Sequence, residues 1–581
     1  MFEKKVNVYE KTRRKKQAPQ SKNTLAKDAN ALERYKFVQE HSQVVDGAMS
    51  LTSTGNEFVD DFGKLSTYLT AGKKDSKGHV KSWGREIVNI FKTMSLLASI
   101  DLVKAVLLMC YIRIITRTTK LLGKEYNAKG QGLRKEYLGR LMWLAANHKD
   151  LFQKNLRVFI ALGSWQDIFD LMELEVQYGE KVLNWKFLAV FILQELSNPE
   201  QSELIKKYMP TIKSISNCKT EHNKCCNVIA KRLAQYWFNQ GKTMDKNTRV
   251  KCYNEYRKLK ASGKAHLWQR QISQGDFNKI NFNTIGGRAL NLLAKTKFLK
   301  NHGLENKFKK FIMSKPVAKY TGFVHELFKG VKSFSDIQWM TVEKQFAGLI
   351  DTAKKGADTQ TGFVVAIDGS GSMGSPTYCC PNMCSFDMAK AFVLYFSNLL
   401  EGKFKNTYIQ FNTKAVIANL PKGNVKTQWN SIRSFGGYTN LINVATLFVD
   451  VLKSGAKEEE MPSGLLCISD GDFNVGSNSL ETTAQTFLKE LRKGGFSKEY
   501  VDNFKVVIWD IPNTFMGINR NSKFQALASA PNVFTMAGFD PSCISFLTGM
   551  ECKKEGTVSQ ITPEELFNSA ISQDILKQLV F

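Results

Sequence analysis

Proline, histidine and acidic residues are all scarce in this sequence. The 581 residues include 12 prolines and 7 histidines, and 53 Asp and Glu stand against 82 Lys and Arg. The scarcity of proline fits a chain built largely of successive helices. The deficit of acid leaves a formal net charge of +29. This charge favours a polyanionic partner, with nucleic acid ahead of a membrane surface, and solvated lysine-rich faces are the plain alternative.

Targeting and membrane signals are also missing. The first residues, MFEKKVNVYEKTRRKKQ, are charged and have no apolar stretch behind them, so no secretory signal is expected. The most apolar stretch, Met94 to Ile115, is broken by Asp101, Lys104 and Arg113, and therefore predicts a buried helix with no membrane span. The odd number of cysteines, 11, indicates free thiols in a reducing compartment, and hence a cytoplasmic protein.

Catalytic signatures are absent as well. The sequence contains no Walker loop, no HExxH and no nucleophile–base constellation, so we expect no enzyme. The group CKTEHNKCC offers Cys218, His222, Cys225 and Cys226 as soft ligands. Their spacing crowds them onto one helix, whereas tetrahedral zinc normally draws ligands from two elements. Free thiols are therefore the default prediction here.

Composition divides the chain into three parts. Residues 1–45 form a polar, basic arm that contains the cluster Arg13 to Lys16. Residues 46–358 show helix after helix and predict a HEAT-like α-solenoid, whose closed or horseshoe curve would offer a basic inner face to a single strand. Residues 359–581 alternate strand and helix signals, which predicts a doubly wound, Rossmann-like α/β domain. The fold class is thus multi-domain, α followed by α/β.

In the α/β half the sequence predicts the bounds of individual strands and helices. We expect strands at 363–367, 407–411, 415–419, 464–468, 505–511 and 533–536. We expect helices at 387–400, 440–453, 481–493, 521–529 and 563–579.

A loop of small hydroxylated residues follows the first of these strands. The stretch FVVAIDGSGSM reads as a buried parallel strand that ends at Asp368, followed by Ser370 and Ser372 between glycines. Thr439 lies in a glycine-containing loop before a helix, and Asp470 ends the strand GLLCIS. Hard oxygen ligands at the carboxyl ends of parallel strands suit Mg²⁺. A plain glycine–serine turn is the alternative for the first loop alone.

The ordered set Asp368, Ser370, Ser372, Thr439 and Asp470 resembles the metal-ion-dependent adhesion site (MIDAS) of von Willebrand factor A (vWA) domains. The resemblance implies that the two serines and the threonine contact the metal directly or nearly so, and that the two aspartates act largely through water. A Mg²⁺ ion, or another divalent cation, held in this way remains electrophilic and can accept an Asp or Glu carboxylate from a partner protein. Such a site serves recognition, and no catalytic residue is predicted.

Segments of the helical half carry a second resemblance. They include KGQGLRKEYLGRLMWLA at 129–145, LGSWQDIFDLM at 162–172, QRQISQGDFNKINFNTIGGRAL at 269–290 and GFVHELFK at 322–329. Their order resembles the TROVE module of the Ro ribonucleoprotein family, and more closely its uncharacterised relatives with TROVE-like and vWA parts in plants, fungi and large DNA viruses. In the Ro family a helical ring, held together by the vWA domain, binds single-stranded RNA ends and structured RNAs.

The resemblance implies an RNA-binding ring or scaffold that forms part of a ribonucleoprotein. Basic residues in the TROVE-like segments are the candidate RNA contacts, because lysine and arginine neutralise phosphates. They are Arg113, Arg117, Lys120, Arg134, Lys135, Arg140, Arg270 and Arg288.

The alternative is a structural or adhesion-type component of a virus particle or other large assembly, which would grip partner proteins through the vWA metal. The composition, rich in Lys, Asn and Phe, suggests an AT-rich genome, which fits a virus or a low-GC microbe. The oligomeric state does not follow from the sequence.

Overall fold

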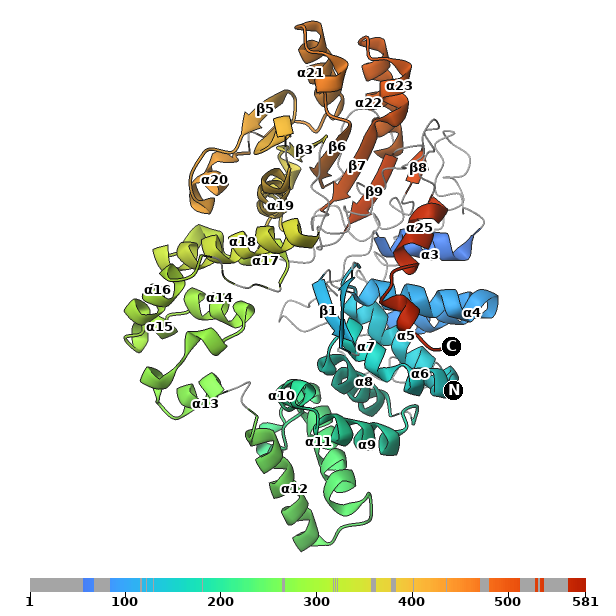
Figure 1. The fold of residues 1–581 in the computed structure, drawn as a ribbon, viewed down its shortest axis with the longest axis vertical. Coiled ribbons are helices and arrows are strands. Elements are labelled where there is room, and N and C mark those ends of the chain that lie inside the picture. The colour runs from blue at the N-terminus through green and yellow to red at the C-terminus, as the bar shows by residue number, and fades with distance from the viewer. Residues whose placement is uncertain are drawn as a thin grey trace, which may run out of the picture.

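Figure 1 shows the computed structural model, a curved series of helices joined to an α/β domain. The structure describes residues 56–66, 84–114, 117–121, 123–128, 130–179, 181–263, 267–316, 318, 320, 322–356, 362–377, 383–400, 402–434, 436–470, 480–511, 528–530, 533–537 and 563–581. The basic arm predicted at 1–45 lies outside these residues.

The first half is mostly helical, as predicted. Its helices are α3 (Glu57–Ser66), α4 (Gly84–Arg113), α5 (Arg134–Asn147), α6 (Lys149–Lys154), α7 (Leu156–Leu162), α8 (Trp165–Tyr178), α9 (Trp185–Glu195), α10 (Pro199–Tyr208), α11 (Glu221–Asn239), α12 (Lys246–Ala261), α13 (Leu267–Ser273), α14 (Gly287–Lys295), α15 (Phe298–Asn301), α16 (Glu305–Met313), α17 (Val324–Leu327) and α18 (Asp336–Gly356). Short 3₁₀ turns link several of them.

A β-hairpin, which the sequence did not predict, interrupts this helical series. Strands β1 (Arg117–Leu121) and β2 (Lys124–Ala128) pair in antiparallel register, with Leu121 opposite Lys124. Gly123 supplies the positive φ of 81° that this tight turn requires. The two strands are short and largely polar, so they lack the alternation of apolar and polar residues that predicts a strand.

Helix α4 is long and apolar enough to cross a membrane by length and composition, over Asn89–Arg113. Its backbone leaves the helical conformation at Asp101, with φ −156° and ψ 102°. There the Asp101 carboxylate accepts a hydrogen bond from the Lys104 backbone N–H at 3.0 Å and so caps the second part. One face is buried, including Met94 and Met109, and the prediction of a buried helix holds for that face.

The second half contains one mixed sheet, β5-β4-β3-β6-β7-β9-β8. Its central strands are parallel, and β5 and β8 pair in antiparallel fashion at the two edges. The strands are β3 (Phe363–Asp368), β4 (Thr407–Phe411), β5 (Ala415–Asn419), β6 (Gly464–Ser469), β7 (Lys505–Asp510), β8 (Ala528–Ala530) and β9 (Val533–Ala537). The helices are α19 (Ser385–Leu399), α20 (Val425–Ser431), α21 (Ile442–Lys453), α22 (Leu480–Lys493), α23 (Lys498–Asn503) and α25 (Pro563–Ile571).

Two predicted helices of this half differ from the structure. The end of the helix predicted at 521–529 overlaps strand β8, and the rest of that range lies outside the described residues. The helix predicted at 563–579 ends at Ile571, and the 3₁₀ turn η10 (Leu576–Gln578) follows it. Ile571, Ile575 and Leu579 keep a four-residue spacing, so the apolar period continues past the end of the helix and does not mark it.

The two faces of the sheet belong to two different cores. Val365 and Ile367 of β3 join the large core that also contains α19 and the helices from α3 to α11. Val364 and Ala366 face a second core, with α21 and α22. Alternate residues of a strand point to opposite faces, so both faces are covered and β3 is buried throughout. The large core joins the helical half to the α/β half.

The end of the chain returns to its first described helices. Helix α25 lies against α3 and α4 (Figure 1). The Phe567 ring packs on Phe58 and Phe62, with ring centroids 6.0 and 5.8 Å away. Val580 donates its backbone N–H to the Asn155 Oδ1 at 2.7 Å, and its carbonyl accepts from the Asn155 Nδ2 at 2.8 Å.

The other end of the helical series also contacts the α/β half. Helices α17 and α18 pack on α19 and α20. Phe328 stacks on Trp429 of α20, with centroids 4.4 Å apart, and the Val425 backbone N–H donates to the Glu343 Oε2 at 2.6 Å. Both ends of the helical curve thus pack against the α/β half. We call this double contact the closure.

We predict that Phe567→Ala loosens this closure. Truncating a buried Phe costs about 3–5 kcal/mol, and the lost contacts fall on α3 and α4. Hydrogen exchange of the full chain should therefore become faster in α3 and α4 and stay unchanged in α21. Phe581→Ala, at a half-exposed position, is the matched control. Unchanged exchange in α3 would contradict the closure.

We also predict acid sensitivity through His325 of α17, whose ring stacks on Phe323 and meets Phe392 of α19 edge-on. Burial lowers the pKa of His325 to about 4. A folded-state pKa below the unfolded value of about 6.5 gives stability that is present above that value and is lost as the pH falls toward 4.

Between pH 7 and pH 5 this loss amounts to about 2 kcal/mol, since one pKa unit corresponds to about 1.4 kcal/mol. Urea unfolding at both pH values measures it. His325→Gln should flatten the pH dependence, and His302→Gln, at an exposed position, should leave it unchanged. Equal slopes for the native chain and His325→Gln would reject this role.

Candidate functional site

Two aspartates lie at the carboxyl ends of neighbouring parallel strands. Asp368 ends β3, and Asp470 follows β6 directly. The register places Ile367 beside Ile468, so the carboxyl ends of β3 and β6 lie next to each other at the edge of the sheet. Both carboxylates are fully buried. The chain moves from β3 outward to β4 and β5 and then returns to β6, so this edge is the switch point at which open α/β sheets bind ligands.

The loop after β3 folds back on Asp368. The Ser370 backbone N–H donates to the Asp368 Oδ1 at 2.8 Å, and the Ser469 hydroxyl donates to the Asp368 Oδ2 at 2.6 Å. The Ser370 and Ser372 hydroxyl oxygens lie 3.0 Å apart. Ser370 is buried and Ser372 is half-buried, so the pair lies between the carboxylates and the surface.

The loop that carries Thr439 is tied onto the Ser370 loop. The Gly436 backbone N–H donates to the Gly369 carbonyl at 3.1 Å, and the Gly371 N–H donates to the Gly437 carbonyl at 3.4 Å. Gly436 and Gly437 have φ of 69° and 98°, a left-handed backbone that glycine adopts without strain. These contacts bring Thr439 to the same edge as Asp368.

Thr439 provides the test of whether these residues fit a cation. Its side chain is fully buried, and its Oγ1 has no hydrogen-bond partner among the residues that the structure describes. A buried hydroxyl without a partner is costly, and a metal ion would satisfy it. Burial, and then the charge of Asp470, raise the pKa of Asp368 to about 7. The donor types, hydroxyls and carboxylates at one edge of the sheet, fit a hard divalent cation.

An insert, residues 375–386, follows the loop of Ser370 and Ser372, and its two ends pair in antiparallel fashion. Pro376 pairs with Cys384, and the Thr377 backbone N–H donates to the Met383 carbonyl at 2.9 Å. The tip of the insert, 378–382, lies outside the described residues. The stem places the insert directly beside the loop that carries Ser370 and Ser372.

The structure corrects the RNA prediction for Arg113 and Arg140. Both side chains are buried and paired: Arg113 with Asp167 at 2.7 Å, and Arg140 with Asp61 at 2.7 Å. A guanidinium that is enclosed by protein and already neutralised by a carboxylate cannot reach a phosphate. These two arginines stabilise the helical core.

Two more of the predicted RNA contacts are engaged with carboxylates. Arg134 bridges Asp167 at 2.6 Å and Asp170 at 2.5 Å. Arg288 pairs with Glu326, with its Nη2 at 2.5 Å from the carboxylate. Each pair joins two of the segments that resemble the TROVE module. The arginines in these segments thus hold the helices to one another.

The remaining candidates fall into two groups. Lys120 is exposed on β1, 3.3 Å from the exposed Glu125, and Lys135 is half-buried on α5. The backbones of Arg117 and Arg270 lie in β1 and α13, and their side chains lie outside the described part of the structure. The structure therefore does not gather the eight predicted residues into one surface.

Of the comparisons with known proteins, the one with solved structures found similar chains. No family model matches the chain, and no curated protein matches it. Among solved structures, the chain is similar to the crystal structure of the Ro (RSR) protein of Deinococcus radiodurans, with a TM-score of 0.37 and 12% sequence identity. The match covers 85% of this chain and 99% of that chain.

Proposed function

We propose that this chain is a non-catalytic scaffold with two binding functions. Its α/β half holds a divalent cation, Mg²⁺ or a similar ion, at the edge formed by β3 and β6, and presents it to an acidic side chain of a partner protein. Its basic helical half binds RNA. The observation that carries the proposal is the buried Thr439 hydroxyl, which has no hydrogen-bond partner among the described residues, at the same sheet edge as two buried carboxylates.

The metal half of the proposal assigns a role to each residue. Ser370, Ser372 and Thr439 would hold the cation through their hydroxyl oxygens, and Asp368 and Asp470 would supply the negative charge. When bound, the cation supplies an electrophilic position for a carboxylate. Ser372 is half-buried and Gly371 is exposed, so a partner can approach from that side.

The absence of catalysis is proposed from the same geometry. The Asp368 carboxylate is occupied by the Ser370 N–H and the Ser469 hydroxyl, which orient it and leave it little freedom to ligate a second metal. Two-metal catalysis needs carboxylates that bridge or ligate both ions directly. Recognition is therefore the activity that this arrangement supports.

The RNA half rests on charge and exposure. The sequence has 82 Lys and Arg against 53 Asp and Glu, so basic residues remain in excess by 29 even if every acid is paired. Exposed lysines recur in the helical half. Lys297 caps α15, Lys300 lies in α15, and Lys309 and Lys310 lie in α16, all exposed. These four residues, the α15–α16 lysines, replace the buried arginines as the proposed phosphate contacts.

We predict that Mg²⁺ stabilises the metal-stripped chain. At 100 times its Kd the ion should add about 2.7 kcal/mol to the free energy of unfolding, measured by thermal or urea denaturation. Thr439→Ala should weaken this response. Asp470→Asn should abolish it and should stabilise the chain in chelator, because the charge of Asp470 raises the pKa of Asp368.

Thr446→Ala, at an exposed position on α21, is the matched control and should respond to Mg²⁺ as the native chain does. An equal response in the native chain and in Asp470→Asn would place the ion elsewhere and refute this site.

We predict that single-stranded RNA binds with a steep salt dependence. Each phosphate contact contributes about −0.7 to the slope of log K against log salt, so loss of two lysines should reduce the slope by about 1.4. Lys309→Glu/Lys310→Glu therefore weakens binding most at low salt. A filter-binding or fluorescence titration at two salt concentrations measures both quantities.

Lys453→Glu/Lys457→Glu, in the α/β half, gives the same change of net charge and is the control. If both double variants lose affinity equally, binding follows net charge alone and the helical half has no RNA surface. If the native chain binds no RNA at low salt, the metal site remains as the only proposed binding function, as in the structural component of a large assembly.

A further inference from the structure

Helix α8 carries three carboxylates at intervals of three residues, Asp167, Asp170 and Glu173, which places them along one side of the helix. The first two are neutralised by arginines. Arg113 and Arg134 pair with Asp167, and Arg134 also pairs with Asp170. No arginine pairs with Glu173 among the described residues. Its interaction partner is His222 of α11.

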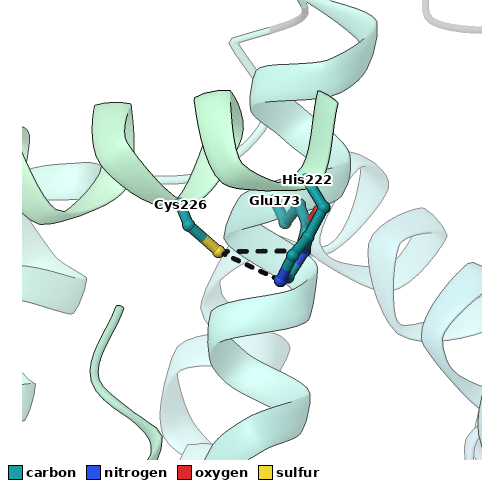
Figure 2. Close-up of side chains that lie close together, drawn as sticks. All are labelled: Glu173, His222 and Cys226. Atoms are coloured by element: carbon teal, nitrogen blue, oxygen red, sulfur yellow. Dashed lines mark hydrogen bonds and ion pairs between the residues drawn. The ribbon is translucent and has the colours of Figure 1, made fainter. Parts of the chain in front are cut away.

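His222 and Cys226 lie one turn apart on α11 and point toward Glu173 of α8 (Figure 2). The His222 Nδ1 lies 2.7 Å from the Glu173 Oε1. The Cys226 Sγ lies 3.6 Å from the His222 Nε2 and 3.8 Å from its Nδ1. One ligand atom from each residue lies within 4.8 Å of the other two. Three residues from two helices thus converge on one point.

We propose that Glu173, His222 and Cys226 form a Zn²⁺ site that links α8 to α11. Tetrahedral zinc has Zn–S bonds of about 2.3 Å and Zn–N bonds of about 2.0 Å, which separate its sulfur and nitrogen ligands by about 3.6 Å. The measured separation of the Cys226 Sγ and the His222 Nε2 is 3.6 Å. Glu173 completes the set when it exchanges its hydrogen bond to the imidazole for the metal.

The ligand types select the metal. A thiolate and an imidazole favour zinc over Mg²⁺ and Ca²⁺, which take oxygen ligands. Cysteine binds zinc as the thiolate, so the Cys226 thiol must lose its proton when the metal binds. Zinc replaces that proton, and binding therefore releases it. The sulfur–metal bond forms as the S–H bond breaks, and the proton passes to solvent.

The fourth coordination position faces the surface. The His222 side chain is 66% exposed, while Glu173 is 19% exposed. Asp170, one turn before Glu173 on α8, is occupied by Arg134 at 2.5 Å. Three protein ligands with one open position leave room for water or for a donor atom of a bound molecule. The site therefore both fastens two helices and offers a second metal position, distinct from the edge of the sheet.

The test is a zinc titration of the full, reduced, metal-stripped chain in competition with a chromophoric chelator. Excess Mg²⁺ is present throughout, so the oxygen site at the sheet edge is filled and does not contribute. Cys226→Ser and His222→Gln should each lower the zinc affinity by more than about 100-fold, since even partners behind the ligands contribute 10–100-fold. Glu173→Gln should lower it at least about tenfold.

Cys218→Ser and Cys384→Ser change cysteines outside the cluster and should bind zinc as the native chain does. Co²⁺ provides a second readout, because a thiolate ligand gives a charge-transfer band in the near ultraviolet. That band should appear in the native chain and be missing in Cys226→Ser, while circular dichroism shows that both are folded. A native chain that binds no zinc, or a Cys226→Ser variant with unchanged affinity and band, overturns the proposal and leaves the Mg²⁺ proposal untouched.

Discussion

Mutual repulsion between two buried carboxylates is the constraint around which the α/β half is arranged. Asp368 and Asp470 leave adjacent parallel strands at the same edge, and neither reaches solvent. Hydrogen bonds from Ser370 and Ser469 offset part of the Asp368 charge, yet burial and the charge of Asp470 still raise the pKa of Asp368 to about 7. A cation at this edge would offset the remaining charge and also satisfy the Thr439 hydroxyl. Backbone hydrogen bonds join the loop that carries Ser370 to the loop that carries Thr439 at this edge.

Buried ion pairs play the corresponding part in the helical half. Asp167 accepts from Arg113, Arg134 and the Ser164 backbone N–H, which joins α4, α5 and the start of α8. Gly163 has to be glycine because a Cβ there would lie 2.1 Å from the Asp167 carboxylate. Removing one partner of such a pair strongly destabilises the fold, since the other charge is left buried and unpaired. The segments that resemble the TROVE module are therefore packing motifs in this chain.

This difference explains which predictions succeeded. The strands β3 to β6 begin and end within one residue of their predicted bounds, because apolar runs closed by polar residues mark buried parallel strands. Asp368 and Asp470 stand at the carboxyl ends of such strands. They lie at the same edge because the two strands are neighbours in the sheet. The partners of Arg113 and Arg140 lie 54 and 79 positions away along the chain, so no local sequence pattern indicates these ion pairs. The same holds for Glu173, which lies 49 positions from His222 in the sequence, so the proposed zinc cluster could not be predicted from a local pattern.

The most direct measurement of the central claim is a crystal structure of the full chain soaked in Mn²⁺, with the ion located by its anomalous scattering. The account predicts a peak at the carboxyl edge of β3 and β6, within about 2–3 Å of the Ser370, Ser372 and Thr439 hydroxyl oxygens. The peak should disappear in Asp470→Asn crystals grown under the same conditions. No peak at that edge, with Thr439 satisfied by an ordered water, would contradict the account, because the buried donor set would then have a function other than holding a cation.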